Sequence, residues 1–169
     1  MTGEPLISSE CGVLAFDIET LGLSPEALRG EGLALGKGVS VAAVWDCSGG
    51  RCYNFIRSDD DAENQAQKDK FMEELDRAQT LVAYNGSSFD LPFVATEFCV
   101  DRGRLQAWQF KTFDPLSIVR LCYGQRLKLS QMLKQNELDS KIASGLEVCR
   151  PTRTAYIPST RVHAACVLS

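Results

Sequence analysis

The stretch from Gly12 to Leu23 constrains this chain more than any other, because a short hydrophobic run ends there in two acidic residues. The run is too short for the core of a helix, and turn-forming residues follow it, which predicts a β-strand. Side chains alternate along a strand, so one face is expected to carry Val13, Ala15, Asp17 and Glu19 and the other Leu14, Phe16 and Ile18. Both faces are apolar until the end of the run. Such a strand is typical of the middle of a sheet that helices cover.

Asp17 and Glu19 fall at the carboxyl end of this strand, where open α/β sheets place their ligands. Two carboxylates spaced about 7 Å apart by the rise of a strand repel each other and lose solvation at a sheet edge. The stretch contains no basic residue, the nearest being Arg29. All-oxygen ligands suit a hard divalent cation such as Mg²⁺ or Mn²⁺. The alternative is that the strand reaches solvent and both acids are merely hydrated.

Length and charge narrow the class of protein. A chain of 169 residues with 44% hydrophobic and 24% charged residues is the size of one globular domain with a substantial core. The formal net charge is −4 and the isoelectric point about 5.1, which argues against a passive nucleic-acid coat. It does not argue against an enzyme whose metal ions contact phosphate groups.

The cysteines and the amino terminus indicate the compartment. Seven cysteines form no Cys-x-x-Cys pair, their number is odd, and many lie in apolar runs, which predicts free buried thiols. The chain has a single histidine, His163, which argues against a zinc site, because closed zinc sites normally use clustered Cys and His ligands. Residues 1–10 lack the features of a secretion signal, and no apolar run reaches the length of a membrane span. We therefore expect a reducing intracellular location (cytoplasm or nucleus), with no secretion and no membrane insertion.

The rest of the chain predicts the order βββαβαβα, a mixed sheet with helices packed on its faces. Further strands are expected at 39–47, 51–57, 80–84 and 110–113, with a hairpin turn at 48–50. Helices are expected to about Arg77, at 91–100, and as helical turns at 115–122 and 129–138. The acidic run 58–61 is interpreted as N-cap and first-turn residues of the first helix, in preference to a metal site.

A second stretch with candidate functional residues covers residues 81–93. The strand breaks at Asn85-Gly86, and a helix is expected to begin near Phe89 with Pro92 in its first turn, a position that proline tolerates. Asp90 thus falls at a helix start just beyond a strand end. Capping of that helix is a competing role for Asp90.

The two stretches together, Phe-Asp-Ile-Glu-Thr-x-Gly at 16–22 and Tyr-Asn-Gly-x-x-Phe-Asp-Leu-Pro-Phe at 84–93, resemble the first two motifs of the DEDD superfamily of 3'-to-5' exonucleases. The resemblance spans roughly residues 13–138 and includes 112–115 and 127–130. It implies an α/β fold of the RNase H-like kind, with a mixed five-stranded sheet of order 3-2-1-4-5 flanked by helices.

The resemblance also implies roles for individual residues. Asp17 and Glu19 would bind the catalytic metal ions, and Asp90 would support the second one. The remaining site residues implied are Thr20 and Leu21, which would contact the terminal nucleotide, and Asn85 and Phe89, which would shape the groove beside it. Two Mg²⁺ or Mn²⁺ ions would activate water and stabilise the leaving oxygen, with the 3' end of DNA or RNA as the substrate. Metal ions between acidic protein and anionic substrate are compatible with a net charge of −4.

The sequence departs from the family pattern at its carboxyl end. A last motif, Tyr or His followed four or five residues later by a metal-binding Asp, is expected on a late helix, but 148–169 contains no acidic residue. We therefore divide the chain into an RNase H-like exonuclease domain at 1–147 and a divergent tail at 148–169, with a shortened, alternatively spliced or frame-shifted end as the simplest account. Two prolines in the tail predict an irregular or extended segment. The acids that could replace the missing one are Asp114, Glu137, Asp139 and Glu147; Asp114 is the most family-like, and its expected role is to cap the next helix.

Two functions of different class remain open at this point. The first is a metal-dependent 3'-to-5' exonuclease, weak or incomplete because the third motif is missing. The second is a catalytically inactive RNase H-like module that binds nucleic acid or a protein partner. In either case Asp17, Glu19 and Asp90 are expected to converge in one cleft. Sequence does not distinguish DNA from RNA or single strand from duplex, and it leaves the oligomeric state open.

Overall fold

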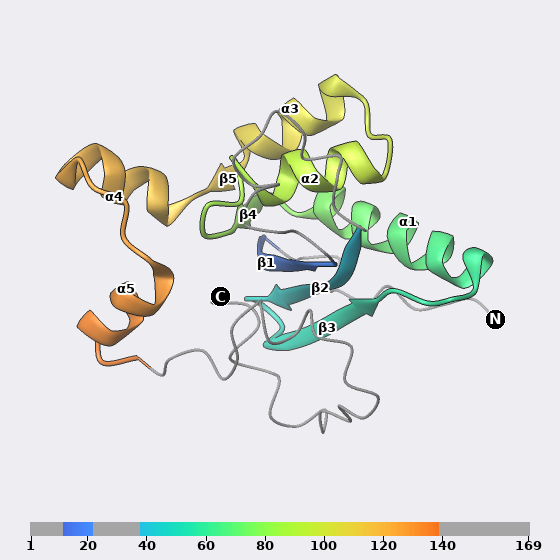
Figure 1. Cartoon of the computed structure of the whole chain (residues 1–169), viewed down its shortest axis with the longest axis horizontal. Helices are drawn as coiled ribbons and strands as arrows, with labels where there is room; N and C mark the ends of the chain where they lie inside the picture. Colours follow the sequence, from blue (N-terminus) through green and yellow to red (C-terminus); the bar gives the residue numbers. More distant parts are fainter. Residues whose placement is uncertain (1–11, 22–37, 139–169) are drawn as a thin grey trace.

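The computed structural model describes residues 12–21 and 38–138, which form a five-stranded mixed sheet of order β3-β2-β1-β4-β5 (Figure 1). The strands are β1 (Val13–Thr20), β2 (Val39–Asp46), β3 (Arg51–Ile56), β4 (Thr80–Val82) and β5 (Thr112–Phe113). β1 pairs antiparallel with β2, and β2 with β3, whereas β1–β4 and β4–β5 are parallel pairs. The predicted fold class and strand order are confirmed.

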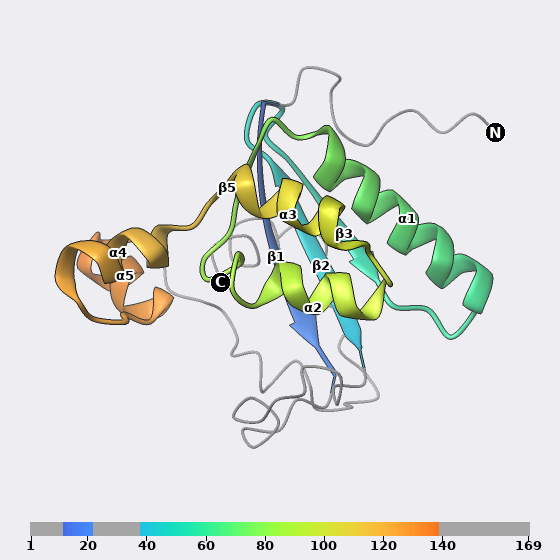
Figure 2. The same ribbon diagram turned by 90° about the horizontal axis from the view of Figure 1, so that it is seen from above.

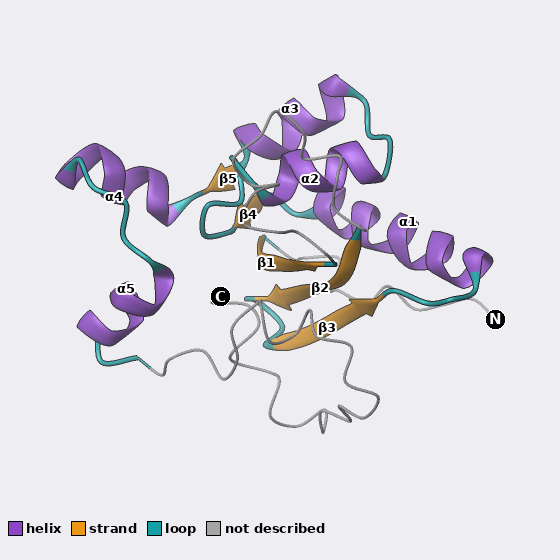
Figure 3. Ribbon diagram, viewed as in Figure 1, coloured by secondary structure: helices purple, strands orange, loops and turns teal. Residues whose placement is uncertain are grey.

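Five helices complete the described part of the chain (Figure 3). They are α1 (Asp61–Arg77), α2 (Asp90–Glu97), α3 (Arg102–Phe110), α4 (Pro115–Tyr123) and α5 (Leu129–Gln135). α1, α2 and α3 lie on one face of the sheet (Figure 1). α4 and α5 lie beside β5 and project away from the rest of the described chain (Figure 2). None of the described helices is long and apolar enough to cross a membrane.

The core lies between the sheet and α1. Leu14, Phe16 and Ile18 of β1 belong to it, as the alternation predicts. The ring of Phe71, from α1, meets the rings of Phe16 and Phe55 edge to face, with centroids 6.3 and 5.4 Å apart. Since one face of β1 packs on α1, its other face carries the side chains of the alternate residues, including Asp17 and Glu19.

Local signals in the sequence explain the first hairpin and the first helix. The carboxylate Oδ1 of Asp46 accepts hydrogen bonds from the amides of Ser48 and Gly49, both at 2.9 Å, and so closes the predicted turn. Asp60 caps α1 by accepting from the amide of Glu63 at 2.8 Å. The acidic run 58–61 is therefore structural, as predicted, because it satisfies amides at the positive end of the helix.

The prediction missed α3 and misplaced its neighbours. The expected helix at 91–100 begins one residue earlier and ends at Glu97, and the expected strand at 110–113 is only Thr112–Phe113. Between them, Asp101 caps α3 by accepting from the amides of Gly103 and Arg104. The fourth strand and the last helix are also shorter than expected, ending at Val82 and Gln135.

The prediction that the cysteines are free and buried is half right. The four in the described ranges are free thiols, but Cys47, Cys99 and Cys122 are exposed and Cys52 is half-buried. Apolar sequence neighbours did not predict burial, because the four lie in the turn after β2, on the edge strand β3 and at the ends of α2 and α4. The tail at 148–169, Asp139 and Glu147 lie outside the described residues.

Candidate active site

The carboxyl end of β1 presents Asp17 and Glu19, both half-buried, on the face opposite α1. The neighbouring residue on that face, Ala15, pairs with Trp45 of β2 and Val82 of β4, so this face is apolar around the acids. The end of the strand is fixed by hydrogen bonds. The hydroxyl of Ser40 donates to the carbonyl of Glu19 at 2.9 Å, which holds the acidic end of β1 against β2.

The loop after β4 leads to Asp90 through a tight turn. Asn85 adopts a left-handed conformation with φ 67°, and its carbonyl accepts from the amides of Ser88 and Phe89. At Gly86 an added Cβ would lie 2.2 Å from the Cβ of Ala83, which no side chain tolerates. The sequence Asn85-Gly86 is therefore required for the chain to turn back toward β1.

Asp90 is the first residue of α2, and it is buried with 3% of its surface exposed. The N-cap of α2 is Phe89, which makes no side-chain capping bond. Instead of capping its own helix, Asp90 reaches the sheet: its Oδ1 accepts from the amide of Ile18 at 3.3 Å. The alternative role considered for Asp90, helix capping, is thus not what its carboxylate does. The bond places Asp90 beside Asp17.

The surroundings of Asp17 and Asp90 disfavour ionisation of both carboxylates at once. Burial, followed by the negative charge of Asp17, raises the pKa of Asp90 to about 8, and Asp114 adds to the effect. The amide of Ile18 opposes it. Within the described residues no basic side chain contributes to this pKa shift. A buried acid in such surroundings is stable when it is neutral or when a cation compensates its charge.

Asp114 connects the loop before Asp90 to the next helix. Its Oδ1 accepts from the amide of Leu116 at 3.0 Å, which confirms the predicted cap of α4. The same oxygen accepts from the amide of Asn85 at 2.9 Å, a contact that the sequence does not suggest. Asp114 therefore holds the start of the loop that leads to Asp90.

The other predicted site residues fall at the same edge of the sheet. Thr20 is buried and Leu21 half-buried at the end of β1, and the amide of Leu21 donates to the carbonyl of Gly38 at 2.8 Å. Asn85 and Phe89 are half-buried in the loop before Asp90, and the ring of Phe89 stacks on that of Phe93. They gather because β1 and β4 are parallel, so both strands end at one edge. Glu137, a considered substitute for the missing acid, is exposed after α5.

Two of the three acids that were expected to converge in one cleft lie together. Asp17 and Asp90 interact, but residues 12–21 and 38–138 contain no group of three or more His, Cys, Asp or Glu side chains arranged to hold a metal ion. The donors present are nevertheless all carboxylates, which suit Mg²⁺ or Mn²⁺. The raised pKa of Asp90, with no basic side chain acting on it, fits a position that a cation would occupy.

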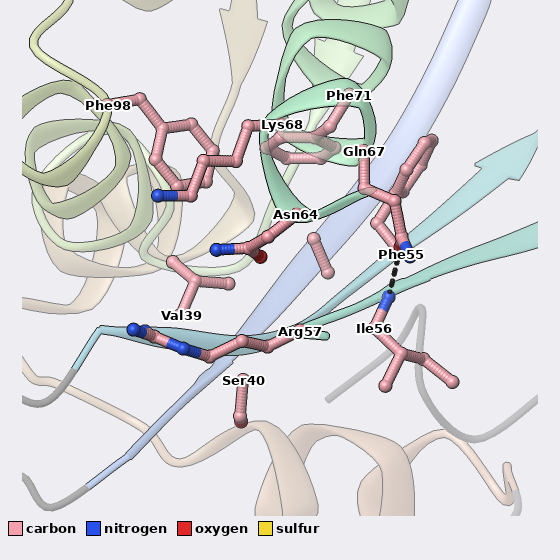
Figure 4. A pocket seen from close by; sticks show the side chains of 11 residues that line it. Val39, Ser40, Phe55, Ile56, Arg57, Asn64, Gln67, Lys68, Phe71 and Phe98 are labelled. Atoms are coloured by element: carbon pink, nitrogen blue, oxygen red, sulfur yellow. Dashed lines mark hydrogen bonds between the residues drawn. The ribbon is translucent and has the colours of Figure 1, made fainter. Parts of the chain in front are cut away.

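A small pocket between α1 and the strands β2 and β3 is separate from these acids (Figure 4). It lies on the α1 face, where the amide of Ile56 donates to Oε1 of Gln67 at 2.8 Å. Lys68 lies over the ring of Phe98 at 5.0 Å and 3.9 Å from Glu97. The charged side chains at this pocket, Arg57 and Lys68, pair with Glu97 within the protein, so this pocket is not the candidate site.

Comparison with known families agrees with this geometry. The family model of the RNase H superfamily matches residues 14–150, which is most of the chain. The chain belongs to the RNase H superfamily. Its matched region contains the Asp17–Asp90 pair, the loop between β4 and α2, and the α4–α5 segment.

A solved structure gives the same fold for this RNase H superfamily member. The family B DNA polymerase from the hyperthermophilic archaeon Pyrobaculum calidifontis matches with a TM-score of 0.59 and 21% sequence identity. The match covers 92% of this chain and 22% of the polymerase, so the chain corresponds to a small part of that protein. No curated protein sequence matches the chain significantly.

Proposed function

We propose that this RNase H superfamily chain is a metal-dependent 3'-to-5' exonuclease of the DEDD type, which hydrolyses the terminal phosphodiester bond of DNA or RNA. One observation carries the proposal. Asp17 of β1 and Asp90 of α2 meet at the carboxyl edge of the parallel strands, and Asp90 is buried without a basic partner among the described residues. Most acids at helix starts cap the helix, whereas this one is directed at the strand that carries the other acids.

The carboxylates would hold the catalytic ions. Asp17, Glu19 and Asp90 would bind Mg²⁺ or Mn²⁺, which when bound supplies activated water and stabilises the leaving oxygen. The chain's own contribution is position: the bond from the amide of Ile18 fixes the carboxylate of Asp90 against β1. Fixed ligands lower the cost of ordering the site when a substrate arrives.

Four further residues would contact the substrate. Thr20 and Leu21, at the end of β1, would touch the terminal nucleotide, and Asn85 and Phe89 would border it from the loop before α2. The stacking of Phe89 on Phe93 supports its ring from behind. Residues 148–169 contain no acid that could act as the last ligand of the family motif. We therefore expect slow turnover of this chain, because even an outer partner of a metal typically contributes 10- to 100-fold in affinity or activity.

The direct test is degradation of a 5'-labelled oligonucleotide in the presence of Mn²⁺. The wild-type chain should shorten it in single-nucleotide steps from the 3' end. Asp17→Asn should reduce the rate by at least 10- to 100-fold, since it removes a charge from the metal site while keeping the size of the side chain. Asp59→Asn, which removes a charge from an exposed acid outside the site, is the matched control and should leave the rate unchanged.

Three other outcomes would each reject the proposal and point to a different alternative. Internal cuts would indicate an endonuclease, and degradation that persists in Asp17→Asn would place the activity elsewhere or in a contaminant. Binding of the oligonucleotide without any cleavage would support the second function, an inactive module that binds nucleic acid.

A further inference from the structure

The helices α4 and α5 form a pair that concentrates positive charge in an otherwise acidic chain. The segment 115–136 contains four basic residues and no acid, although the net charge of the whole chain is −4. The basic residues are Arg120, Arg126, Lys128 and Lys134. All four are exposed, and none forms an ion pair with another described residue. Their charge is therefore available to an external anion.

This helix pair is attached to the edge of the sheet that carries the candidate site. Asp114 caps α4 and also holds the amide of Asn85, in the loop before Asp90. The hydroxyl of Tyr84, next to Asn85, donates to the carbonyl of Leu127 between α4 and α5 at 2.6 Å. Figure 2 shows the pair extending outward from β5. A chain bound at Asp17 and Asp90 could therefore continue onto α4 and α5.

An open hollow is lined by residues of both helices and of the segment that joins them. Its lining combines apolar and amide side chains: Val119, Tyr123, Gln125, Leu127, Met132, Gln135 and Asn136. Tyr123 is 74% exposed, so much of its side chain faces solvent. Arg120 and Tyr123 are three residues apart and therefore lie on one side of α4. An aromatic ring, amides and nearby cations are the groups that contact unpaired bases and their phosphates.

We propose that the α4–α5 pair binds a single-stranded nucleic-acid segment just upstream of the 3' end. This inference rests on the proposed exonuclease function and names its substrate class. The four cations would neutralise phosphates, and Tyr123 would stack on an unpaired base. A duplex hides its base faces and would leave the exposed ring of Tyr123 without a stacking partner. The apolar groups beside the cations thus favour a single strand.

The first test is binding of a fluorescein-labelled 20-nucleotide single strand, measured by anisotropy in EDTA so that nothing is cleaved. The variant Arg126→Ala/Lys128→Ala should bind more weakly, and the slope of log affinity against log salt should fall by about 1.4, since each lost contact to a single strand contributes about 0.7. The control Lys70→Ala/Arg102→Ala removes two exposed charges from α1 and α3 and should match the wild type.

Substitutions of Tyr123 test the contribution of base stacking to binding separately from that of charge. Tyr123→Ala should weaken binding by about 5- to 150-fold, because base stacking on an aromatic ring is typically that strong. Tyr123→Phe keeps the ring and should bind like the wild type. Thermal melts of every variant must show an intact fold. A blunt duplex of the same length that binds as tightly as the single strand would overturn the inference. So would an Arg126→Ala/Lys128→Ala variant that binds like its control, Lys70→Ala/Arg102→Ala.

A second substrate distinguishes this inference from the function it rests on. The p-nitrophenyl ester of thymidine 5'-monophosphate has no upstream strand to contact α4 and α5. If the inference holds, Arg126→Ala/Lys128→Ala slows degradation of the oligonucleotide and leaves hydrolysis of the ester unchanged. Equal losses on both substrates would contradict the inference alone. If the wild type hydrolyses neither substrate, the exonuclease proposal fails, while the anisotropy experiment still decides the binding surface.

Discussion

Asp114 shows how a single residue can position a site without touching the reacting atoms. One oxygen, Oδ1, accepts from the amide of Asn85 and from the amide of Leu116. The carboxylate therefore links the loop before Asp90 to the start of α4. The sequence Thr-Phe-Asp-Pro predicts the helix cap, but the bond to Asn85 depends on β4 and β5 lying side by side.

Replacing Asp114 tests this link. Asp114→Ala uncaps α4 and leaves the amide of Asn85 without its acceptor, so we expect a loss of about 2 kcal/mol in the free energy of unfolding. Asp114→Asn retains an acceptor oxygen and should lose less than half as much. Urea denaturation measures both. Equal losses in the two variants would show that the charge of Asp114, and not its hydrogen bonds, stabilises the protein.

Glu74 is a buried acid on α1, outside the candidate site. Its side chain is nearly inaccessible, its Oε1 lies 3.4 Å from Nη1 of Arg77, and its Oε2 has no hydrogen-bond partner among the described residues. Burial raises the pKa of Glu74; Arg77 and Lys70 oppose the shift, and Glu73 and Asp46 reinforce it. The folded protein therefore holds this proton more tightly than the unfolded chain does.

The sign of the resulting pH dependence follows from linkage. Stability contributed by protonated Glu74 is complete below the ordinary pKa of a glutamate, 4.5, and is lost as the pH rises through the higher value of the folded state. Glu74→Gln removes this dependence, so its stability relative to the wild type should increase between pH 5 and pH 8. Urea denaturation at several pH values measures the difference. A difference that is constant with pH would contradict the assignment.

Among the elements, α3 contacts α1 through a side chain that serves two partners. Trp108 is the one buried residue of α3, and its Nε1 donates to Oδ1 of Asp76 at 2.6 Å. Arg104 binds the other oxygen of Asp76 at 2.6 Å. Asp76 thus satisfies the buried indole and a surface guanidinium together. This contact attaches α3 to α1.

Loss of that contact should be measurable as a loss of stability. Asp76→Ala leaves the buried indole N–H of Trp108 unsatisfied, which typically costs about 1–3 kcal/mol in the free energy of unfolding. Asp76→Asn keeps an acceptor for the indole and should retain most of the stability. Glu73→Ala, at an exposed position on the same helix, is the control and should change little. If Asp76→Ala unfolds at the same denaturant concentration as Glu73→Ala, the contact does not stabilise the docking of α3.

The contrast between β1 and α3 explains which elements the sequence predicts. β1 is buried on most of its length, so its hydrophobic run is visible without further information. α3 buries only Trp108 and contains Gly103, so it shows no helical period of apolar residues. The one local signal for α3 was Asp101, a capping residue before a short segment. Short helices held by one anchor are predictable only when their packing partner is known.

At the scale of the whole molecule, the sequence predicts the sheet order and the meeting of Asp17 with Asp90. That pair arises because β1 and β4 are parallel neighbours, which the order of elements and the family resemblance both imply. The sequence does not predict that the described residues lack a third metal-ligating side chain grouped with this pair. The sequence also gives no sign of the hydrogen bonds by which Asp114 and Tyr84 attach α4 and α5 to this edge.

We propose that Asp17 and Asp90 form part of a divalent-metal site, which calorimetric titration with Mn²⁺ can detect. The wild type should bind Mn²⁺ saturably, and its melting temperature should rise with Mn²⁺ concentration because the folded state alone assembles the ligands. Asp17→Asn and Asp90→Asn should each bind at least tenfold more weakly, whereas Asp59→Asn should bind like the wild type. Mn²⁺ binding that is equal in the wild type and Asp17→Asn, or absent from a folded wild-type protein, would contradict the account.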